Sequence, residues 1–531
     1  ALEIRLAISR LSETQVEERE SLYQEIVESC PATKEAEEAL WALSNLYLDS
    51  FPEPQEQTAQ EVLELFLDRD SAWGLQVRSR LILLYSGTER RERAAELCRE
   101  LLGRRPETLP ASCRPFVALA EAVDKTVTPV RASRPRVIPS ADELSRAAAT
   151  LNGAQKVTIL AGAGVEGAHD LVIELADKLA APIVHTLRGK QFIEYNNPFD
   201  VGMTGLLGFA SGYRAMENCD TLLMLGTDFP YRPFLPDNAQ VIQIDLRGEH
   251  LGRRIPLKQG IVGDAAESVR ELLPLLQRKE NRGHLEDSLS NYRKTRAKLD
   301  DLATPRSGDK PLHPQYVAKM IDKLAADDAV FLPDVGSPVI WAARYLKMNG
   351  RRSLIGSFIH GSMANALPQG IGAAASHPGR QVVALSGDGG VEMLLGELLT
   401  AVQNKLPVKV VVFNNSTLGM VKLEMLVNGL PDFGTDVHDV NYAGVAQSIG
   451  FHAERVDDPR DLRRAFQKAF DFNGPALVEV ITDPNALSLP PEITGEQLIG
   501  FATAMSKIVL NRGAGEAVSM ATSNMRNIPR F

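Results

Sequence analysis

The chain has 531 residues, of which 44% are apolar and 24% charged, and this length allows about three globular domains with sizeable cores. A formal net charge of −10 gives a nucleic-acid partner no general electrostatic support. The four scattered cysteines form no CxxC pair, no apolar run approaches the ~20 residues of a membrane span, and no signal-peptide stretch is visible, so we expect a cytoplasmic protein.

Residues 1–109 carry no convincing strand pattern and are predicted to be helical throughout. The segment from Leu22 to Pro31 resembles the segment from Leu97 to Pro106, and a Leu-Tyr pair at position 46 recurs 38 residues later at position 84. A repeat of this length in paired helices resembles tetratricopeptide repeats, and an irregular helical bundle is the alternative. Because no group of catalytic side chains occurs here, we expect this segment to bind a protein partner or to act as a scaffold.

Residues 110–139 differ in composition from both neighbours, and the Pro-containing stretch at 128–135 predicts an extended linker. The region 140–280 then alternates apolar strands with helices, which is the rhythm of β-α-β units in a parallel sheet. Its strands are expected at 157–160, 182–185, 221–225 and 241–244, with a helix at 171–179.

A charged helical connector is predicted at 281–325 and a second α/β domain at 326–486. The strands of this domain are expected at 329–332, 381–385, 408–413 and 476–481. A tail over 487–531 follows, in which Thr494 is expected to cap an amphipathic helix. The predicted fold class is therefore α/β, with two doubly wound parallel sheets preceded by an all-helical segment.

Polar residues follow two of the strands expected in the second domain. One strand runs into Gly387-Asp388-Gly389, a helix is expected from Val391 to Asn404, and the next strand ends in Asn414-Asn415. A right-handed crossover makes the two strands parallel, so Asp388 and Asn415 emerge at the same carboxyl edge of the sheet. With the backbone carbonyl of Thr417 they offer the oxygen ligands that Mg²⁺ prefers, and the nearby helix N-terminus offers N–H groups to a diphosphate.

A Gly-Asp-Gly motif followed after 24 residues by Asn-Asn resembles the signature of thiamine diphosphate enzymes. The flanking segments 334–336, 341–345, 356–366 and 414–420 are similar to those of bacterial pyruvate oxidases that pass electrons to a membrane quinone. This resemblance extends from about residue 140 to the end of the chain. It implies cofactor contacts at Gly361, Ser362, Met363, Asp388, Gly389, Gly390, Asn415, Ser416, Thr417, Leu418, Gly419, Met420 and Val421. Met363 would support the thiazolium ring, whereas His360 is either an active-site or a structural histidine.

A second glycine-rich motif, Gly162-x-Gly164-x-x-Gly167, follows the first strand of the central domain. Alone it is weak, and the missing acidic residue after the second strand counts against an NAD site. Segments 202–208 and 226–232 resemble the FAD-binding stretches of the same oxidases. By this resemblance, Arg188 of the present chain would pair with the pyrophosphate of FAD. The FAD contacts that the resemblance implies are Thr204, Gly205, Leu206, Leu207, Thr227, Asp228, Phe229, Pro230, Tyr231 and Asp245. The alternative is a vestigial flavin domain, as in non-redox carboligases.

In the resembled family, an N-terminal domain binds the aminopyrimidine of the cofactor and supplies a glutamate that helps to generate the reactive ylid. Residues 1–130 do not resemble that domain, and glutamates such as Glu35, Glu37 and Glu38 are expected on solvated helix faces. We therefore assign no catalytic residue and expect little catalysis by this chain alone.

The resemblance implies oxidative decarboxylation of pyruvate to acetate and CO₂, with thiamine diphosphate, Mg²⁺ and FAD as cofactors and a membrane quinone as electron acceptor. It also implies a homotetramer and a lipid contact of the tail at the inner face of the cell membrane, although the tail is poor in Lys and Arg. The apolar face expected in the tail comprises Leu498, Phe501, Met505, Ile508 and Val509. The alternatives are an acetolactate synthase-type carboligase and a non-enzymatic cofactor-binding assembly protein.

Overall fold

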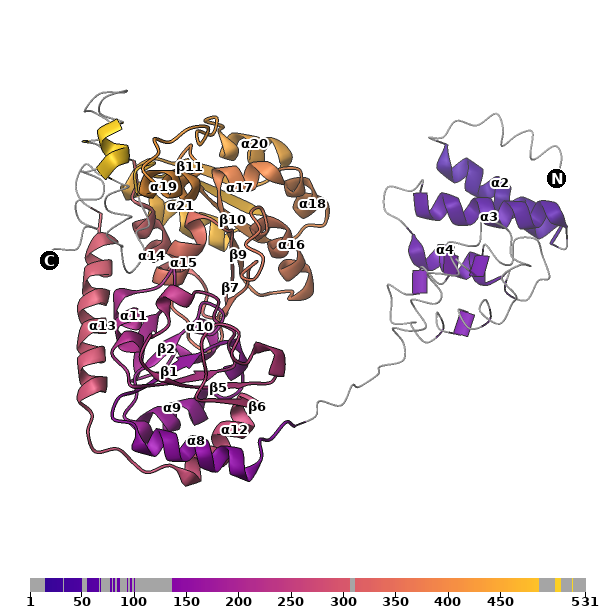
Figure 1. Ribbon diagram of the computed structural model, residues 1–531. Coiled ribbons are helices and arrows are strands. Elements are labelled where there is room, and N and C mark those ends of the chain that lie inside the picture. The colour runs from indigo at the N-terminus through magenta and orange to yellow at the C-terminus, as the bar shows by residue number, and fades with distance from the viewer. Residues whose placement is uncertain are drawn as a thin grey trace. The chain divides into compact units, whose positions relative to one another are not determined.

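The computed structural model describes residues 15–31, 33–49, 55–65, 67, 136–305, 311–486, 502–507 and 518, with scattered positions between 77 and 100. The chain divides into two compact units, residues 1–134 and 135–531 (Figure 1). Most of the linker expected at 110–139 and most of the expected tail helix lie outside the described residues. Within the described part of the chain, no helix is long and apolar enough to cross a membrane.

The described part of the first unit is helical, as the sequence predicts. Its helices are α2 (Val16–Ser29), α3 (Lys34–Asp49) and α4 (Glu56–Glu64), and each packs on the next. Leu43 and Tyr47 of α3 meet Ala59 of α4 in a small core, and the Tyr47 hydroxyl donates to Glu20 Oε1 of α2 at 2.6 Å. The likeness to tetratricopeptide repeats stays a prediction.

The first α/β lobe is built on a six-stranded parallel sheet with the order β3-β2-β1-β4-β5-β6 (Figure 1). Its strands are β1 (Val157–Ala161), β2 (Ile183–His185), β3 (Asp200–Met203), β4 (Thr221–Leu225), β5 (Gln240–Asp245) and β6 (Gln259–Val262). Every residue of β1 and β4 is buried, which suits continuous apolar runs covered on both faces. The sequence predicts the four inner strands. It does not predict the edge strands β3 and β6, because each is short and contains a glycine.

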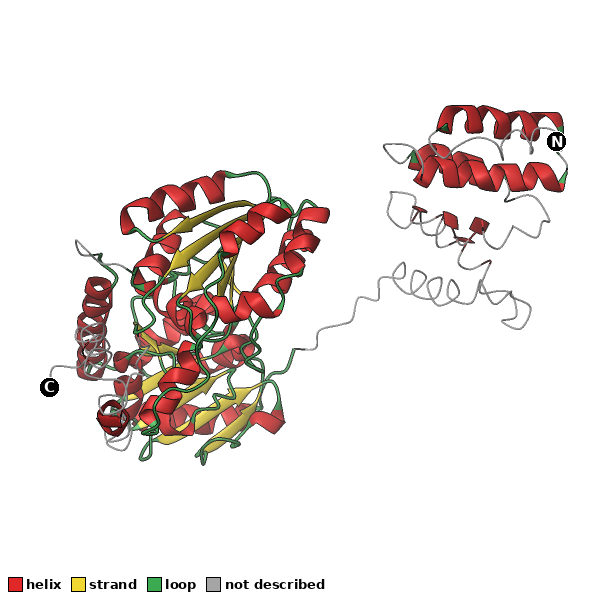
Figure 2. Ribbon diagram, turned by 90° about the horizontal axis from the view of Figure 1, so that it is seen from above, coloured by secondary structure: helices red, strands yellow, loops and turns green. Residues whose placement is uncertain are grey.

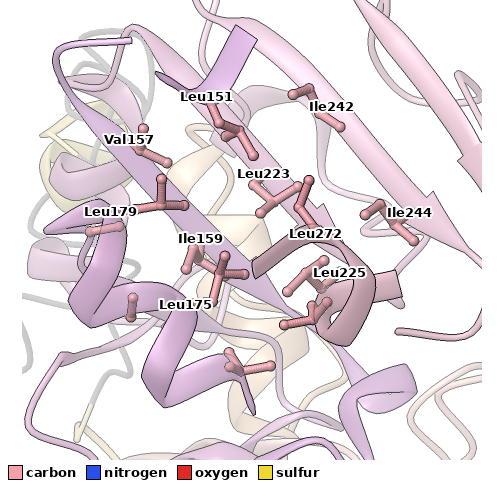
Figure 3. Close-up of a cluster of buried hydrophobic side chains, with 14 of the residues drawn as sticks. Leu151, Val157, Ile159, Leu175, Leu179, Leu223, Leu225, Ile242, Ile244 and Leu272 are labelled. Atoms are coloured by element: carbon pink, nitrogen blue, oxygen red, sulfur yellow. The ribbon is translucent and has the colours of Figure 1, made fainter. Parts of the chain in front are cut away.

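Helices cover both faces of this sheet (Figure 2). They are α8 (Ala141–Gly153), α9 (His169–Leu179), α10 (Lys190–Ile193), α11 (Ala210–Glu217), α12 (Ala265–Leu272) and α13 (Gly283–Leu302). Helix α8 begins at a capping box in which Ser140 and Glu143 satisfy each other's backbone N–H groups. On one face the core combines helix and strand residues, among them Leu151, Leu175, Leu179, Leu272, Val157, Ile159, Leu223, Leu225, Ile242 and Ile244 (Figure 3).

The second lobe holds another six-stranded parallel sheet, with the order β11-β12-β10-β9-β7-β8. Its strands are β7 (Val330–Pro333), β8 (Ser353–Leu354), β9 (Val382–Gly387), β10 (Val408–Asn414), β11 (His452–Val456) and β12 (Ala476–Ile481). Successive residues such as Val410 and Val411 enter separate apolar cores on the two faces. This doubly covered sheet confirms the predicted fold class, although the two-residue β8 and the half-polar β11 were not expected.

The helices of the second lobe are α14 (Pro314–Leu324), α15 (Ser337–Tyr345), α16 (Ala366–Ser376), α17 (Asp388–Met393), α18 (Glu397–Gln403), α19 (Gly419–Val427), α20 (Tyr442–Ile449) and α21 (Pro459–Asp471). The single helix expected at 391–404 is wrong, because the chain leaves helical geometry at Leu394 and Gly396 interrupts the run. In the described piece of the tail, Ala504 packs against Leu423 and Leu426 of α19.

Helix α10 of the first lobe contacts the second lobe directly. Gln191 Oε1 accepts a hydrogen bond from Leu354 N–H at 2.9 Å, and Glu194 Oε2 accepts one from Met348 N–H at 2.9 Å. The buried Lys190 ammonium pairs with the same Glu194 carboxylate. These bonds end on backbone groups of the second lobe, so they define the relative placement of the two sheets.

Asp200 and His185 form a buried pair behind this link, with Asp200 Oδ1 and His185 Nε2 3.5 Å apart. Burial, reinforced by the negative charge of Glu194, raises the pKa of Asp200 to about 7. Burial, together with the positive charge of Lys190, lowers the pKa of His185 to about 4. Between these two pH values both side chains are uncharged, so the contact is not an ion pair despite its short distance.

Replacing Asp200 with Asn should stabilise the protein, relative to the natural chain, by an amount that grows between about pH 4 and pH 7 and is constant above pH 7. The pKa of the carboxyl is 3.8 as a free group and about 7 when folded, so the natural chain loses stability as the pH rises through this window. Thermal melting over this pH range measures the difference. Asp142→Asn, which alters an exposed carboxylate, is the control. Parallel profiles for Asp200→Asn and the natural chain would contradict a neutral Asp200.

Candidate functional site

Two segments meet at the carboxyl edge of the second sheet: the first turn of helix α17, which directly follows β9, and the turn after β10. The strands are parallel with Phe413 opposite Gly387, so the residues that follow them lie side by side. The buried Asp388 carboxylate bridges the two segments, because Oδ1 accepts from Gly389 N–H at 2.8 Å and Oδ2 accepts from Asn415 N–H at 3.1 Å. Burial raises the pKa of Asp388 to about 6, although these backbone hydrogen bonds oppose the rise.

The turn after β10 is closed by its own side chains. Asn415 Oδ1 accepts from Thr417 N–H at 3.2 Å, and Thr417 Oγ1 donates to Thr435 O at 3.1 Å. Between them, Ser416 has a φ of +52°, a left-handed conformation that residues with a Cβ rarely adopt. The turn brings Asn415 and Thr417 to the cavity that Asp388 lines.

The available donors are therefore one carboxylate, one side-chain amide and one main-chain carbonyl. Such a set of oxygen atoms suits a hard cation that shares its remaining ligands with phosphate and water. Among the described residues there is no group of three or more His, Cys, Asp or Glu side chains placed to hold a metal. The chemistry of this edge thus favours Mg²⁺ over zinc or other transition metals.

Ten of the residues that line the cavity above these segments are ones that the sequence predicts as cofactor contacts. These are Met363, Asp388, Gly389, Gly390, Asn415, Thr417, Leu418, Gly419, Met420 and Val421. Gly361, Ser362 and Ser416 belong to the same loops but do not line it. Ser337 and Trp341 of α15 also line the cavity, and the sequence does not predict either as a contact. Ser337 begins the helix after β7, so the strand-end rule that selected Asp388 would have included it.

Glycines at 389 and 390 let the backbone pass close to its neighbours. A Cβ on Gly390 would lie 2.2 Å from Asp334 Oδ2, and one on Gly389 would lie 2.7 Å from Leu418 Cδ2. Asp334 is buried, which raises the pKa of its carboxyl, and it accepts a hydrogen bond from Ser386 Oγ at 2.7 Å. A side chain at 389 would therefore collide with Leu418, which lines the cavity, and one at 390 would collide with the buried groups beneath it.

Asp334 also holds the loop that carries Met363. Its Oδ1 accepts from both the N–H and the Nδ2 of Asn365 at 2.9 Å, and Asn365 Nδ2 donates in addition to Ser362 O at 2.8 Å. Met363 lies between Ser362 and Asn365 in the sequence, and its side chain is 37% exposed at the cavity. His360 lies instead beside a second cavity, which Arg188 of the first lobe also lines.

The glycine-rich loop of the first lobe packs backbone against backbone. A Cβ on Gly162 would lie 2.3 Å from Gly226 O, and one on Gly164 would lie 2.6 Å from Gly226 Cα. Gly164 N–H donates to Gly226 O at 3.0 Å. This close backbone contact explains why glycine is needed at 162 and 164. The two motif glycines are therefore no evidence for a bound dinucleotide.

Residues expected to contact FAD lie beside this loop, at the carboxyl edge of the first sheet. Thr204 Oγ1 is buried and has no hydrogen-bond partner in the described part of the chain. Gly205 has a φ of +94°, and a Cβ there would lie 3.2 Å from the Phe229 ring. Leu206 and Tyr231 are exposed. A ligand with a polar group and a flat apolar part fits this combination.

The two acidic residues of this edge differ in what they offer. Asp228 is paired with Arg253 at 2.9 Å and Arg254 at 3.3 Å, so its charge is already compensated. Asp245 Oδ1 accepts from Arg247 N–H at 2.9 Å, which orients the carboxylate at the end of β5. His250 Nδ1 also lies 3.3 Å from that oxygen, but Asp245 has no arginine partner among the described residues. Asp245 is therefore the better candidate for accepting hydrogen bonds from hydroxyl groups of a ligand.

Comparison with known proteins identifies the two lobes. Residues 334–480 match the model "Thiamine pyrophosphate enzyme, C-terminal TPP binding domain", and residues 144–272 match "Thiamine pyrophosphate enzyme, central domain". The putative thiamine pyrophosphate-containing protein YdaP of Bacillus subtilis is 38% identical over 388 residues, 73% of this chain and 67% of that protein.

Two further relatives carry names of different activities. A probable acetolactate synthase large subunit of Methanococcus aeolicus is 29% identical over 67% of this chain and 63% of its own length. The pyruvate oxidase of Lactiplantibacillus plantarum is 28% identical over 65% of this chain and 58% of its own length. The chain thus spans about two thirds of these relatives or less.

Replacing Gly390 with Ala should destabilise the protein by about 1–3 kcal/mol, the usual cost of overpacking, because the new methyl group meets Asp334 Oδ2 and Ser386 Oγ. Gly396→Ala is the matched control, since a Cβ there meets nothing within 4 Å and its φ of −59° suits alanine. The control should be neutral or slightly stabilised. Urea midpoints compare the two proteins, and equal midpoints would show that Asp334 does not constrain the backbone at 390.

Proposed function

We propose, because the chain belongs to the thiamine pyrophosphate enzyme family, that the cavity of its second lobe binds thiamine diphosphate through Mg²⁺. The observation that carries this proposal is that Asp388, Asn415 and Thr417 line one cavity at one sheet edge, where hydrogen bonds link their turn and helix. The residues fit the group, since a carboxylate, an amide oxygen and a main-chain carbonyl suit Mg²⁺.

Each part of the cavity has a separate task in this proposal. Asp388, Asn415 and Thr417 hold the metal, while Met363 and Leu418 present apolar surface to the rings of the cofactor. When bound, thiamine diphosphate supplies a nucleophilic carbon for attack on the carbonyl group of a keto acid. The buried Trp341 closes the inner end of the cavity against water.

For the reaction, we propose oxidation of pyruvate. Pyruvate and water would give acetate, CO₂, two protons and two electrons, with FAD in the first lobe taking the electrons and a membrane quinone reoxidising the flavin. Support comes from the similarity to the pyruvate oxidase and from two groups at the carboxyl edge of the first sheet. These are the Thr204 hydroxyl, which has no hydrogen-bond partner among the described residues, and the Asp245 carboxylate at the end of β5. A peripheral contact of the tail with lipid belongs to the same proposal.

A carboligase of the acetolactate synthase type is the second candidate. It is favoured by the similarity to acetolactate synthase large subunits, which is as high as that to the pyruvate oxidase. In that reaction a second pyruvate replaces the oxidant, and FAD would have no redox role.

We also propose that a further domain completes the site. The two matched domains are the central and C-terminal ones, while the described residues before position 101 form helices. Met363 and Val421 are 37% and 46% exposed at the cavity, so its rim offers apolar surface to a further domain. A pyrimidine-binding domain with a glutamate would meet this requirement.

Thiamine diphosphate should bind in a Mg²⁺-dependent manner. The Asp388→Ala substitution should abolish most of that binding, because it removes a charged ligand and the bridge between helix α17 and the turn after β10. Isothermal calorimetry with and without Mg²⁺ measures the effect. Asp461→Ala, which removes an exposed carboxylate of the same lobe, is the control and should bind like the natural chain. Equal affinities of the Asp388→Ala and natural proteins would refute the proposed metal site.

Pyruvate-dependent ferricyanide reduction by this chain alone should stay near background. The absence of a general acid/base typically costs roughly 10²–10⁴ in rate, and an open site admits water. Addition of a pyrimidine-binding domain from a related oxidase should raise the rate. Bleaching of the flavin by pyruvate in that mixture supports the oxidase, whereas acetolactate formed without bleaching supports the carboligase. Rapid turnover by the homogeneous chain would contradict the need for a partner.

A further inference from the structure

A fully buried carboxylate, that of Glu479, lies directly behind the candidate metal site. Glu479 is on β12 and is 0% exposed, and it faces Val412 of the neighbouring strand β10. It is not among the residues that line the cavity, so it touches no bound ligand. Burying a carboxylate is costly unless its oxygen atoms are hydrogen-bonded, which makes the choice of its partners informative.

We infer that Glu479 is a positioning residue for the Mg²⁺ site and acts through the side chain of Asn414. This inference rests on the proposed function, because it assigns a role toward the metal that Asp388, Asn415 and Thr417 would hold. Glu479 Oε1 accepts from Asn414 Nδ2 at 2.8 Å, and Oε2 accepts from Ala443 N–H at 2.9 Å.

The Asn414 side chain connects Glu479 to the turn after β10, which carries Asn415 and Thr417. Its Oδ1 accepts from Ser416 N–H at 3.2 Å and from Ser416 Oγ at 3.3 Å. A carboxylate can only accept hydrogen bonds, so Glu479 obliges the Asn414 amide to turn its nitrogen toward β12 and its oxygen toward Ser416. The orientation of this amide is therefore determined by the charge behind it.

Ser416 is the residue that needs such support. Its φ of +52° is unfavourable for a residue with a side chain, and it lies between the two predicted ligands of the loop. Its backbone conformation sets the directions of the Asn415 side chain and the Thr417 carbonyl. Loss of the Asn414 contact would let the loop relax and would spread these oxygen atoms.

Arg455 is a third partner of the Glu479 carboxylate, besides Asn414 and Ala443. Its Nη1 lies 3.4 Å from Glu479 Oε1, and the arginine side chain is 31% exposed and also pairs with Asp439. Arg455 therefore draws an oxygen atom, rather than an amide nitrogen, toward the side on which Asn414 lies. A glutamine at 479 would accordingly keep its oxygen toward Asn414 and lose only the hydrogen bond to Ala443.

The test measures the Mg²⁺ concentration needed for thiamine diphosphate binding, by calorimetry on the full chain. Glu479→Met keeps the side-chain length but removes both acceptors, and it should raise that concentration about 10–100-fold, the usual effect of losing support behind a metal ligand. Asn414→Ala should have the same effect, and the double variant should be no worse than either, because both changes interrupt one chain of contacts. Glu479→Gln should bind nearly as well as the natural chain.

Lys409→Met is the matched control for stability. Lys409 is a buried charge at the opposite end of β10, where its Nζ donates to Gly474 O at 2.8 Å. Its removal should lower the melting temperature and leave the Mg²⁺ requirement unchanged.

Three results would overturn the inference. These are a folded Glu479→Met protein with the natural Mg²⁺ requirement, an equal loss in Lys409→Met, or losses in Glu479→Met and Asn414→Ala that multiply in the double variant. If Glu479→Met does not fold, Asn414→Ala decides, and normal Mg²⁺ dependence there also overturns it. Failure of the natural chain to bind Mg²⁺ and thiamine diphosphate would instead refute the proposed function, and the inference with it.

Discussion

The organisation of the candidate site depends on one interaction, the bridge that the Asp388 carboxylate makes between two backbone N–H groups. One N–H belongs to the first turn of helix α17 and the other to the turn after β10, so a single side chain fixes the separation of these two segments. The parallel register of the strands brings these segments together, but register alone leaves their conformations free. The bridge therefore converts a general property of parallel sheets into a defined set of ligands.

A layer of buried polar side chains supports that bridge from below. Asp334, Ser386 and Asn365 are hydrogen-bonded to one another on one side, and Asn414 and Glu479 are bonded on the other. Asp334, Ser386, Asn365 and Asn414 lie near or after the carboxyl end of a strand, and Glu479 lies within β12, whereas the middle of β9 and β10 is apolar. The cost of burial is met because every member has a partner of matching donor or acceptor type. Precise ligand placement thus comes with local stability rather than at its expense.

The sequence predicts the strands that have a clear local pattern. It does not predict the strands whose formation depends on tertiary contacts. Long apolar runs such as those of β1, β4, β9 and β10 are read correctly, and the strand-end rule places Asp388 beside Asn415. The edge strands β3, β6, β8 and β11 are missed because they are short or half-polar and take their geometry from a neighbour.

The supporting residues of the site are missed for a related reason. Glu479 lies 65 residues after Asn414, and nothing in the spacing of the sequence indicates that their side chains meet. The same holds for Asp200 and His185, whose neutral pairing follows from burial and from the neighbouring charges of Glu194 and Lys190. A motif identifies the atoms that touch a ligand, whereas the groups that orient those atoms are visible only once the sheet order is known.

The two sheet edges differ in how much of a site each contains. At the first, the contact of Gly162 and Gly164 with Gly226 closes the strand ends, so a ligand has to lie alongside the loops near Thr204. At the second, the strand ends stay open and the metal ligands are preorganised, but the rim is apolar and exposed at Met363 and Val421. Preorganised polar ligands beneath an uncovered apolar rim are the expected form of a half-site, because the polar part needs rigidity from its own fold and the apolar part gains most from burial against a second surface. This separation of polar and apolar surfaces within the cavity therefore agrees with the proposal that a further domain encloses a cofactor held here.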